Sequence, residues 1–312
     1  TGLPSLSGRP LIALFACWAV ARLAWFLPLP MVALAAIELA FVLALLWAFG
    51  RLVFKARQKH NAPIVLVLAL LAACQALTLY GVALGDDALQ RRGTLAALWL
   101  VAALMGIIGG RVIPFFTQRG LGLASQVSMS PWLMWSLLGG SLAIAALTAA
   151  GLNLQPRPLL APLFLLVTAL HGLRLWRWYE SGIWRVPLLW SLHLAYAWMA
   201  VAAFGMALWH LGLVQQPSLA SHALAVGAMG GLILAMLARV SLGHTGRPLT
   251  PPPAIAWAFA LLHGATLCRV LLAGFSVYGL WLAAAGWCLA FALYLRHYAA
   301  MFWTARVDGH PG

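Results

Sequence analysis

Long apolar stretches alternate along this chain with short segments that carry nearly all of its charged residues. Each stretch is close to the roughly 20 apolar residues that an α-helix needs to cross a bilayer. Lipid offers backbone N–H and C=O groups no hydrogen-bond partner, so such a stretch crosses as a helix that satisfies them internally. We therefore predict an all-α, polytopic transmembrane helical bundle, a single domain over residues 1–312, with about ten membrane-spanning helices near residues 10–27, 31–50, 63–84, 95–113, 131–150, 158–176, 187–210, 220–240, 254–273 and 276–298.

The composition excludes an ordinary soluble domain. Hydrophobic residues make up 64% of the chain and charged residues only 8%, whereas charged residues are about 25% of a typical soluble domain. A net charge of +14 would indicate a nucleic-acid partner in a soluble protein. Here the charge follows the predicted spans, so we expect the lipid bilayer as partner and no nucleic acid.

Lys and Arg residues gather on one side of the predicted membrane. The opposite loops hold only Arg91, Arg92, Arg157 and Arg269. By the positive-inside rule, both termini of the chain then face the cytoplasm, and we expect a bacterial inner (cytoplasmic) membrane. The cytoplasmic set lies in the N-terminal segment and after the even-numbered spans: Arg9, Arg51, Lys55, Arg57, Lys59, Arg111, Arg119, Arg174, Arg177, Arg185, Arg239, Arg247, Arg296 and Arg306.

The segment 221–248 is the most distinctive part of the sequence. His222 begins a long uncharged run, and three glycines make one part of it slim enough for close contact with a neighbouring helix: Gly227, Gly230 and Gly231. The run ends in the loop Gly-His-Thr-Gly-Arg-Pro, residues 243–248. The glycines of this loop allow tight turns, and His244 and Arg247 could hold an anion there.

This segment closely resembles the NnrS family of bacterial inner-membrane proteins, whose late helix begins H-x-L-x-V-G-x-M-G and ends R-x-S-L-G-H-T-G-R-P. Residues 111–117 (RVIPFFT), 193–198 (HLAYAW) and 306–312 (RVDGHPG) also resemble that family, so the likeness covers nearly the whole chain. The resemblance implies a haem- and copper-containing protein that counters nitric oxide stress, by NO binding or by redox conversion. It also implies two further helices upstream, with a W-H-x-H-E segment, so we expect this chain to be a fragment whose cofactor site is incomplete.

Histidines are the candidate ligands, because neutral imidazole binds both haem iron and copper. The resemblance favours His193 and His222 as cofactor and metal ligands and His244 as a further metal ligand. For each of them a helix-packing histidine is an equally open interpretation. No C-x-x-C-H segment occurs, so a haem b here would be bound non-covalently.

Three arginines are candidate partners for the haem propionates, because two carboxylates at a membrane interface need cations. Ordinary topological anchoring explains such arginines equally well. The sequence assigns no catalytic residue, does not decide whether the chain is an enzyme, and leaves a homo-oligomer open. The candidates are Arg111, Arg239 and Arg247.

A transporter or channel for a metal ion or a small solute is the alternative function. Intramembrane polar groups often line such a pathway, and His263 and an Arg22/Glu38 pair are available for one. Arg22 lies six residues before Pro28, and Glu38 lies eight residues after Pro30, so we predict that they pair across the turn. Such a pair is either structural or part of a proton relay.

Overall fold

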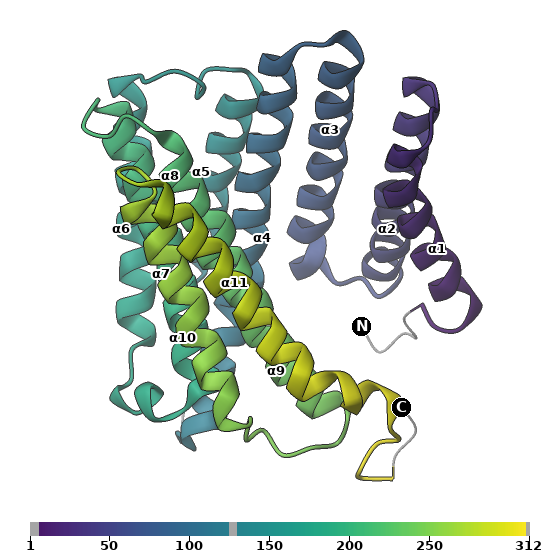
Figure 1. Cartoon of the computed structure of the whole chain (residues 1–312), viewed down its shortest axis with the longest axis vertical. Coiled ribbons are helices and arrows are strands. Elements are labelled where there is room, and N and C mark those ends of the chain that lie inside the picture. Colours follow the sequence, from purple (N-terminus) through teal and green to yellow (C-terminus); the bar gives the residue numbers. More distant parts are fainter. Residues whose placement is uncertain (1–5, 125–129, 310–312) are drawn as a thin grey trace. The chain divides into compact units, whose positions relative to one another are not determined.

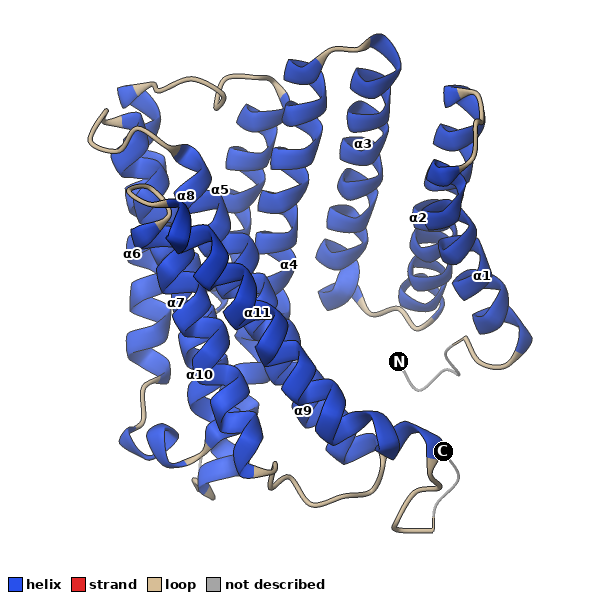
Figure 2. Ribbon diagram, viewed as in Figure 1, coloured by secondary structure: helices blue, strands red, loops and turns tan. Residues whose placement is uncertain are grey.

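The structure is a computed structural model that describes residues 6–124 and 130–309. Over these two ranges every regular element is a helix and none is a strand (Figure 2). Within these ranges, ten helices are long and apolar enough to cross a membrane. The prediction of a helical transmembrane bundle is therefore confirmed, as is the number of candidate spans.

The chain divides into two compact units, residues 1–104 with 141–154 and residues 105–140 with 155–312. We describe each unit by itself, and the single domain expected from the sequence stays a prediction. In the first unit α1 packs against α2, and α2 packs against α3. This unit contains α1 (Arg9–Leu23), α2 (Met31–Lys55), α3 (Ala62–Leu84), the first part of α4 (Asp87–Leu121) and the end of α5 (Pro131–Ala149).

The second unit is built around α7 (Pro187–His210), which contacts α6, α8, η5, α9 and α10 (Figure 1). Leu189, Ala195 and Ala202 of α7 have no exposed surface. A helix that is apolar on several faces belongs inside a bundle. The other elements of this unit are the rest of α4 and α5, with α6 (Ala161–Trp178), α8 (Pro217–His222), η5 (Ala223–Gly230), α9 (Gly231–His244), α10 (Pro253–Leu267), η6 (Cys268–Leu272) and α11 (Val277–Tyr298).

Two of the short elements, η5 and η6, are π-helical. The π-helix is rare and occurs mostly as single turns, frequently at functional sites. The remaining short elements are 3₁₀ turns at helix ends: η1 (Ala24–Phe26), η2 (Lys59–Asn61), η3 (Pro158–Leu160), η4 (Ser181–Arg185) and η7 (Ala299–Trp303).

Helix α4 is longer than the predicted span 95–113, since it runs from Asp87 to Leu121. Its first turn carries an acidic residue, which the helix dipole favours at that end. Pro114 lies inside the helix, although a proline removes one backbone hydrogen bond. Apolar length therefore underestimates this helix at both ends.

Glu38 and Arg22 form the predicted ion pair in the first unit. The Glu38 side chain is buried, while half of the Arg22 side chain is exposed. The carboxylate also accepts hydrogen bonds from Trp25 Nε1 (2.6 Å) and from Gln75 Nε2 (2.9 Å). Both carboxylate oxygens thus have donors, an arrangement that ties α1, α2 and α3 together.

Replacing Glu38 by Gln is expected to lower the free energy of unfolding by about 1–3 kcal/mol. Glutamine keeps one acceptor oxygen, but its NH2 group must face at least one of the three donors, Arg22, Trp25 and Gln75. We expect cofactor content per folded molecule to stay unchanged. Thermal unfolding in detergent, followed by Trp fluorescence, measures the first quantity, and metal analysis the second. Glu180→Gln, which changes a half-buried acid between α6 and η4, is the matched control. A variant of unchanged stability that has lost its cofactor would contradict the structural role.

Candidate functional site

His193 lies in the first half of α7 and is 6% exposed. Its Nδ1 lies 2.9 Å from the carbonyl oxygen of Leu189. A carbonyl only accepts, so Nδ1 carries the proton and donates it. The backbone of Trp178 also comes close to the ring. Nε2, however, is buried with no hydrogen-bond partner in the described part of the chain.

This arrangement fits a metal ligand. A ligating histidine usually donates its other ring N–H to a carbonyl or carboxylate, which fixes the tautomer and the ring orientation. His193 meets that requirement through Leu189. A protonated imidazole buried without a partner would be costly, so the ring is neutral and Nε2 offers a lone pair.

His222, at the end of α8, has the same tautomer but a different environment. Its Nδ1 lies 2.6 Å from the carbonyl oxygen of Ser218, and its Nε2 lies 3.2 Å from Nη2 of Arg269. Arginine is only a donor, so the lone pair on Nε2 accepts from it. A metal at His222 would have to displace Arg269.

The contact between His222 and Arg269 lies where the two π-helical segments begin. His222 is followed directly by η5, and Arg269 belongs to η6. These segments pack among closely approaching helices. A Cβ on Gly227 would lie 2.5 Å from Cγ of Trp198, and a Cβ on Gly231 would lie 2.8 Å from Cβ of Ala195. A Cβ on Gly230 would make only an ordinary contact, at 3.6 Å from Nε1 of Trp287. Close helix contact, expected at all three glycines, is therefore found at Gly227 and Gly231.

The other buried histidines have the opposite tautomer. Nδ1 of His210 accepts from the backbone N–H of Arg157 (3.1 Å). Nδ1 of His263 accepts from Trp198 Nε1 (3.1 Å). Each therefore carries its proton on Nε2 and has Nδ1 already engaged. These contacts are those of packing histidines.

A buried polar network joins α4, α6 and α7. Arg174 is 6% exposed, and its Nη1 donates to the carbonyl of Gly106 (2.8 Å) and to Tyr196 Oη (2.9 Å). Tyr196 Oη lies 3.0 Å from Nδ1 of His171. Because Arg174 supplies one proton to this oxygen, Tyr196 donates its own to His171, and the direction of the chain is fixed.

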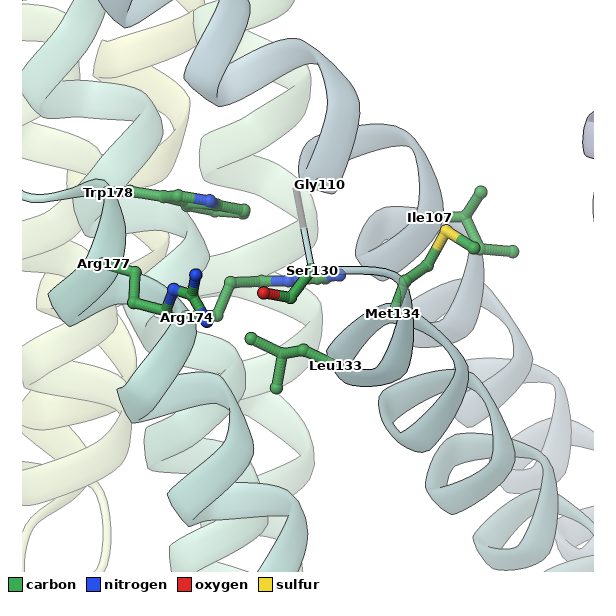
Figure 3. Close-up of a pocket in the computed structure, with 8 residues that line it drawn as sticks. All are labelled: Ile107, Gly110, Ser130, Leu133, Met134, Arg174, Arg177 and Trp178. Atoms are coloured by element: carbon green, nitrogen blue, oxygen red, sulfur yellow. The ribbon is translucent and has the colours of Figure 1, made fainter. Parts of the chain in front are cut away.

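A small cavity borders this network. It has a volume of about 20 Å³, enough for roughly one water molecule. Figure 3 shows Arg174, Arg177 and Trp178 of α6 beside Ser130 and Gly110. A Cβ on Gly110 would lie 3.1 Å from Nη2 of Arg174, so the glycine leaves room for the guanidinium. From the sequence, Arg174 is expected only as one of the cytoplasmic arginines that set the membrane topology.

A larger cleft of about 570 Å³ lies where α4 and α9 end, and we call it the Arg239 cleft. Of the predicted site residues it brings together Arg239 and His244. Arg111 does not line it, and neither does Arg247, whose Nη2 lies 3.4 Å from Thr304 Oγ1. The lining residues are Phe115, Phe116, Arg119, Arg239, Val240, Gly243, His244, Leu249 and Arg306.

The segment around Arg306 is hydrogen-bonded to the end of α9 and the loop that follows it. Arg306 donates to both carboxylate oxygens of Asp308 (3.0 and 2.6 Å) and to the carbonyl of His244 (3.0 Å). Gly246 has φ 73°, and a Cβ there would lie 2.5 Å from Cγ of Asp308. The distinctive loop thus serves to dock the tail, a role that its sequence did not reveal.

His193 and His222, whose Nε2 atoms each carry a lone pair, do not belong to one metal site with several ligands. Across residues 6–124 and 130–309, no group of three or more His, Cys, Asp or Glu side chains could hold a metal ion. His193 lies near the start of α7 and His222 near the start of the next span, so they belong to opposite ends of the bundle. They are candidates for two separate sites.

Comparison with known proteins identifies the family. The family model described as NnrS protein matches residues 1–306. No curated protein matches this chain significantly, and no solved structure does. The match includes His193, His222, His244 and the Arg239 cleft, and it ends at Arg306. Since it covers nearly the whole sequence, this chain belongs to the NnrS family.

Proposed function

We propose that this protein is a haem- and copper-binding membrane protein that lessens nitric oxide stress, by binding NO or by converting it through redox chemistry. Family membership supports this function in general terms. The single observation that carries the cofactor proposal is the buried, unpartnered Nε2 of His193 on the central helix. Haem iron and copper would supply NO binding and electron exchange, which no side chain of this chain can supply alone.

His193 would hold a metal through Nε2 while Leu189 holds the ring in place. Fully buried neighbours, among them Leu192 and Tyr196, exclude water and lower the local dielectric. His222 would bind a second metal once Arg269 withdraws. His244 is exposed beside the Arg239 cleft, and its metal role stays a prediction, as do the propionate roles of Arg111, Arg239 and Arg247.

The same proposal places the protein in the bacterial inner membrane with both termini on the cytoplasmic side. Its support is the charge distribution between the ten spans. The Arg239 cleft would then face the cytoplasmic surface, and the His222–Arg269 contact would face the periplasm.

An optical spectrum of the purified protein tests the proposal. We expect a Soret band in the oxidised and dithionite-reduced protein that shifts on addition of NO, with copper present by metal analysis. Reconstitution with haem before the measurement replaces any haem that dissociates during purification. A well-folded protein that stays colourless and metal-free after reconstitution would overturn the proposal and favour the transport alternative.

A further inference from the structure

Arg239 is a buried cation without an acidic partner. It is 7% exposed and lines the Arg239 cleft. In the described ranges, 6–124 and 130–309, its contact is with the ring of Phe116, whose centroid lies 3.7 Å from Cζ, and no residue there forms a hydrogen bond or ion pair with it. A buried charge that lacks a counter-ion is costly, so this guanidinium is suited to an anion that enters the cleft.

A second arginine shares the cleft. Cζ of Arg119 lies 5.5 Å from the ring centroid of Phe115, so adjacent phenylalanines on α4 stack against two different guanidinium groups. Stacking covers the flat face of a guanidinium and leaves its N–H edge for an oxyanion. Arg306 also lines the cleft, but its charge is neutralised by an ion pair with Asp308. Arg119 and Arg239 are therefore the cations that an incoming anion would meet.

The rest of the cleft is apolar and open. Phe115, Val240 and Leu249 are each at least 40% exposed. A volume of about 570 Å³ lies within the usual range of ligand cavities. The cleft is formed by the last turns of two candidate spans, which is the level of lipid headgroups. An amphiphile with an anionic head would match both kinds of wall.

We propose that the Arg239 cleft binds the headgroup of an anionic phospholipid. The phosphate lies between Arg119 and Arg239, where bidentate N–H···O bonds are available. The glycerol and the start of an acyl chain lie along Phe115, Val240 and Leu249. A free phosphate would use the same two arginines, but it would leave this exposed apolar wall uncovered. The lipid is therefore the better match. The inference does not depend on the proposed function, and it assigns Arg239 to the lipid phosphate in place of the haem propionate.

Native mass spectrometry of the detergent-solubilised protein tests this site. The protein is titrated with phosphatidylglycerol, with phosphatidylcholine of the same acyl chains, and with inorganic phosphate. We expect one phosphatidylglycerol to bind more tightly than phosphatidylcholine, and Arg239→Gln to weaken it about tenfold, the effect of losing one charged hydrogen-bond partner. Arg296→Gln removes an exposed arginine of α11 outside the cleft and is expected to bind like the wild type.

Arg119→Gln protects the test against misfolding of the first variant, because Arg119 is exposed. It is expected to weaken phosphatidylglycerol binding in the same direction. Equal affinity of wild type and both cleft variants for phosphatidylglycerol would overturn the proposal. So would inorganic phosphate binding as tightly as the lipid, or a loss of haem in Arg239→Gln with lipid binding unchanged, which would assign the cleft to a propionate.

Discussion

Replacing His193 by Gln is expected to abolish stable cofactor binding while the protein stays folded. The glutamine amide reaches as far as Nε2 does now, so the bond from Nδ1 to the carbonyl of Leu189 is lost. That carbonyl keeps its helical backbone partner, so we expect the helix to stay intact. The amide has no imidazole lone pair to offer a metal. Mutating a residue behind a metal ligand costs 10–100-fold in affinity, so losing the ligand itself should cost more than about 100-fold. Haem and copper content per folded protein, by absorbance and metal analysis, measure the effect.

His210→Gln is the matched control for this variant. His210 is also buried in α7, but its Nδ1 is engaged by the backbone N–H of Arg157. We expect it to lose stability and to keep its cofactor. If His193→Gln retained the full cofactor content and His210→Gln lost it, the tautomer argument would point to the wrong histidine.

The choice of His193 and His222 shows how far the sequence reaches. Both lie in segments that resemble the family, and both donate Nδ1–H to a carbonyl four residues earlier in the same helix. Each of these bonds joins residues four positions apart in one helix, so it could be predicted from the sequence. What happens at Nε2 is not local. It is buried and unpartnered in one case and bonded to Arg269 in the other, because that depends on which helices pack together.

The buried network of Arg174 was missed for the same reason. Its partners Gly106 and Tyr196 are 68 and 22 residues away in sequence. Seen along the chain, Arg174 is one more cation after an even-numbered span, and the positive-inside rule accounts for it completely. Only the packing of α4, α6 and α7 reveals that the guanidinium is buried.

The ten spans, by contrast, could be predicted well, because a helix in lipid needs an apolar surface of fixed length. The π-helical turns of η5 could not. A hydrophobic pattern records which residues are apolar, and it contains no signal for a change from 3.6 residues per turn. Their place beside His222 therefore emerged only from the structure.

Replacing Gly227 by Ala is expected to cause the largest loss of stability among single-methyl changes in this helix. The added Cβ would lie 2.5 Å from Cγ of Trp198 and 2.7 Å from Cγ2 of Thr266. Both atoms belong to packed neighbouring helices, and overpacking of this kind costs about 1–3 kcal/mol. Movement of Trp198 would also break its hydrogen bond to Nδ1 of His263.

Gly230→Ala provides the control within the same π-helical segment. Its added Cβ would meet Nε1 of Trp287 at 3.6 Å, an ordinary contact. Alanine also favours a helix over glycine by about 1 kcal/mol, so this variant should be as stable as the wild type or slightly more stable. Thermal unfolding of the purified variants in one detergent measures the difference. Equal stabilities of the two variants would mean that the contact with Trp198 does not decide stability here, and the close packing of η5 against α7 would lose its support.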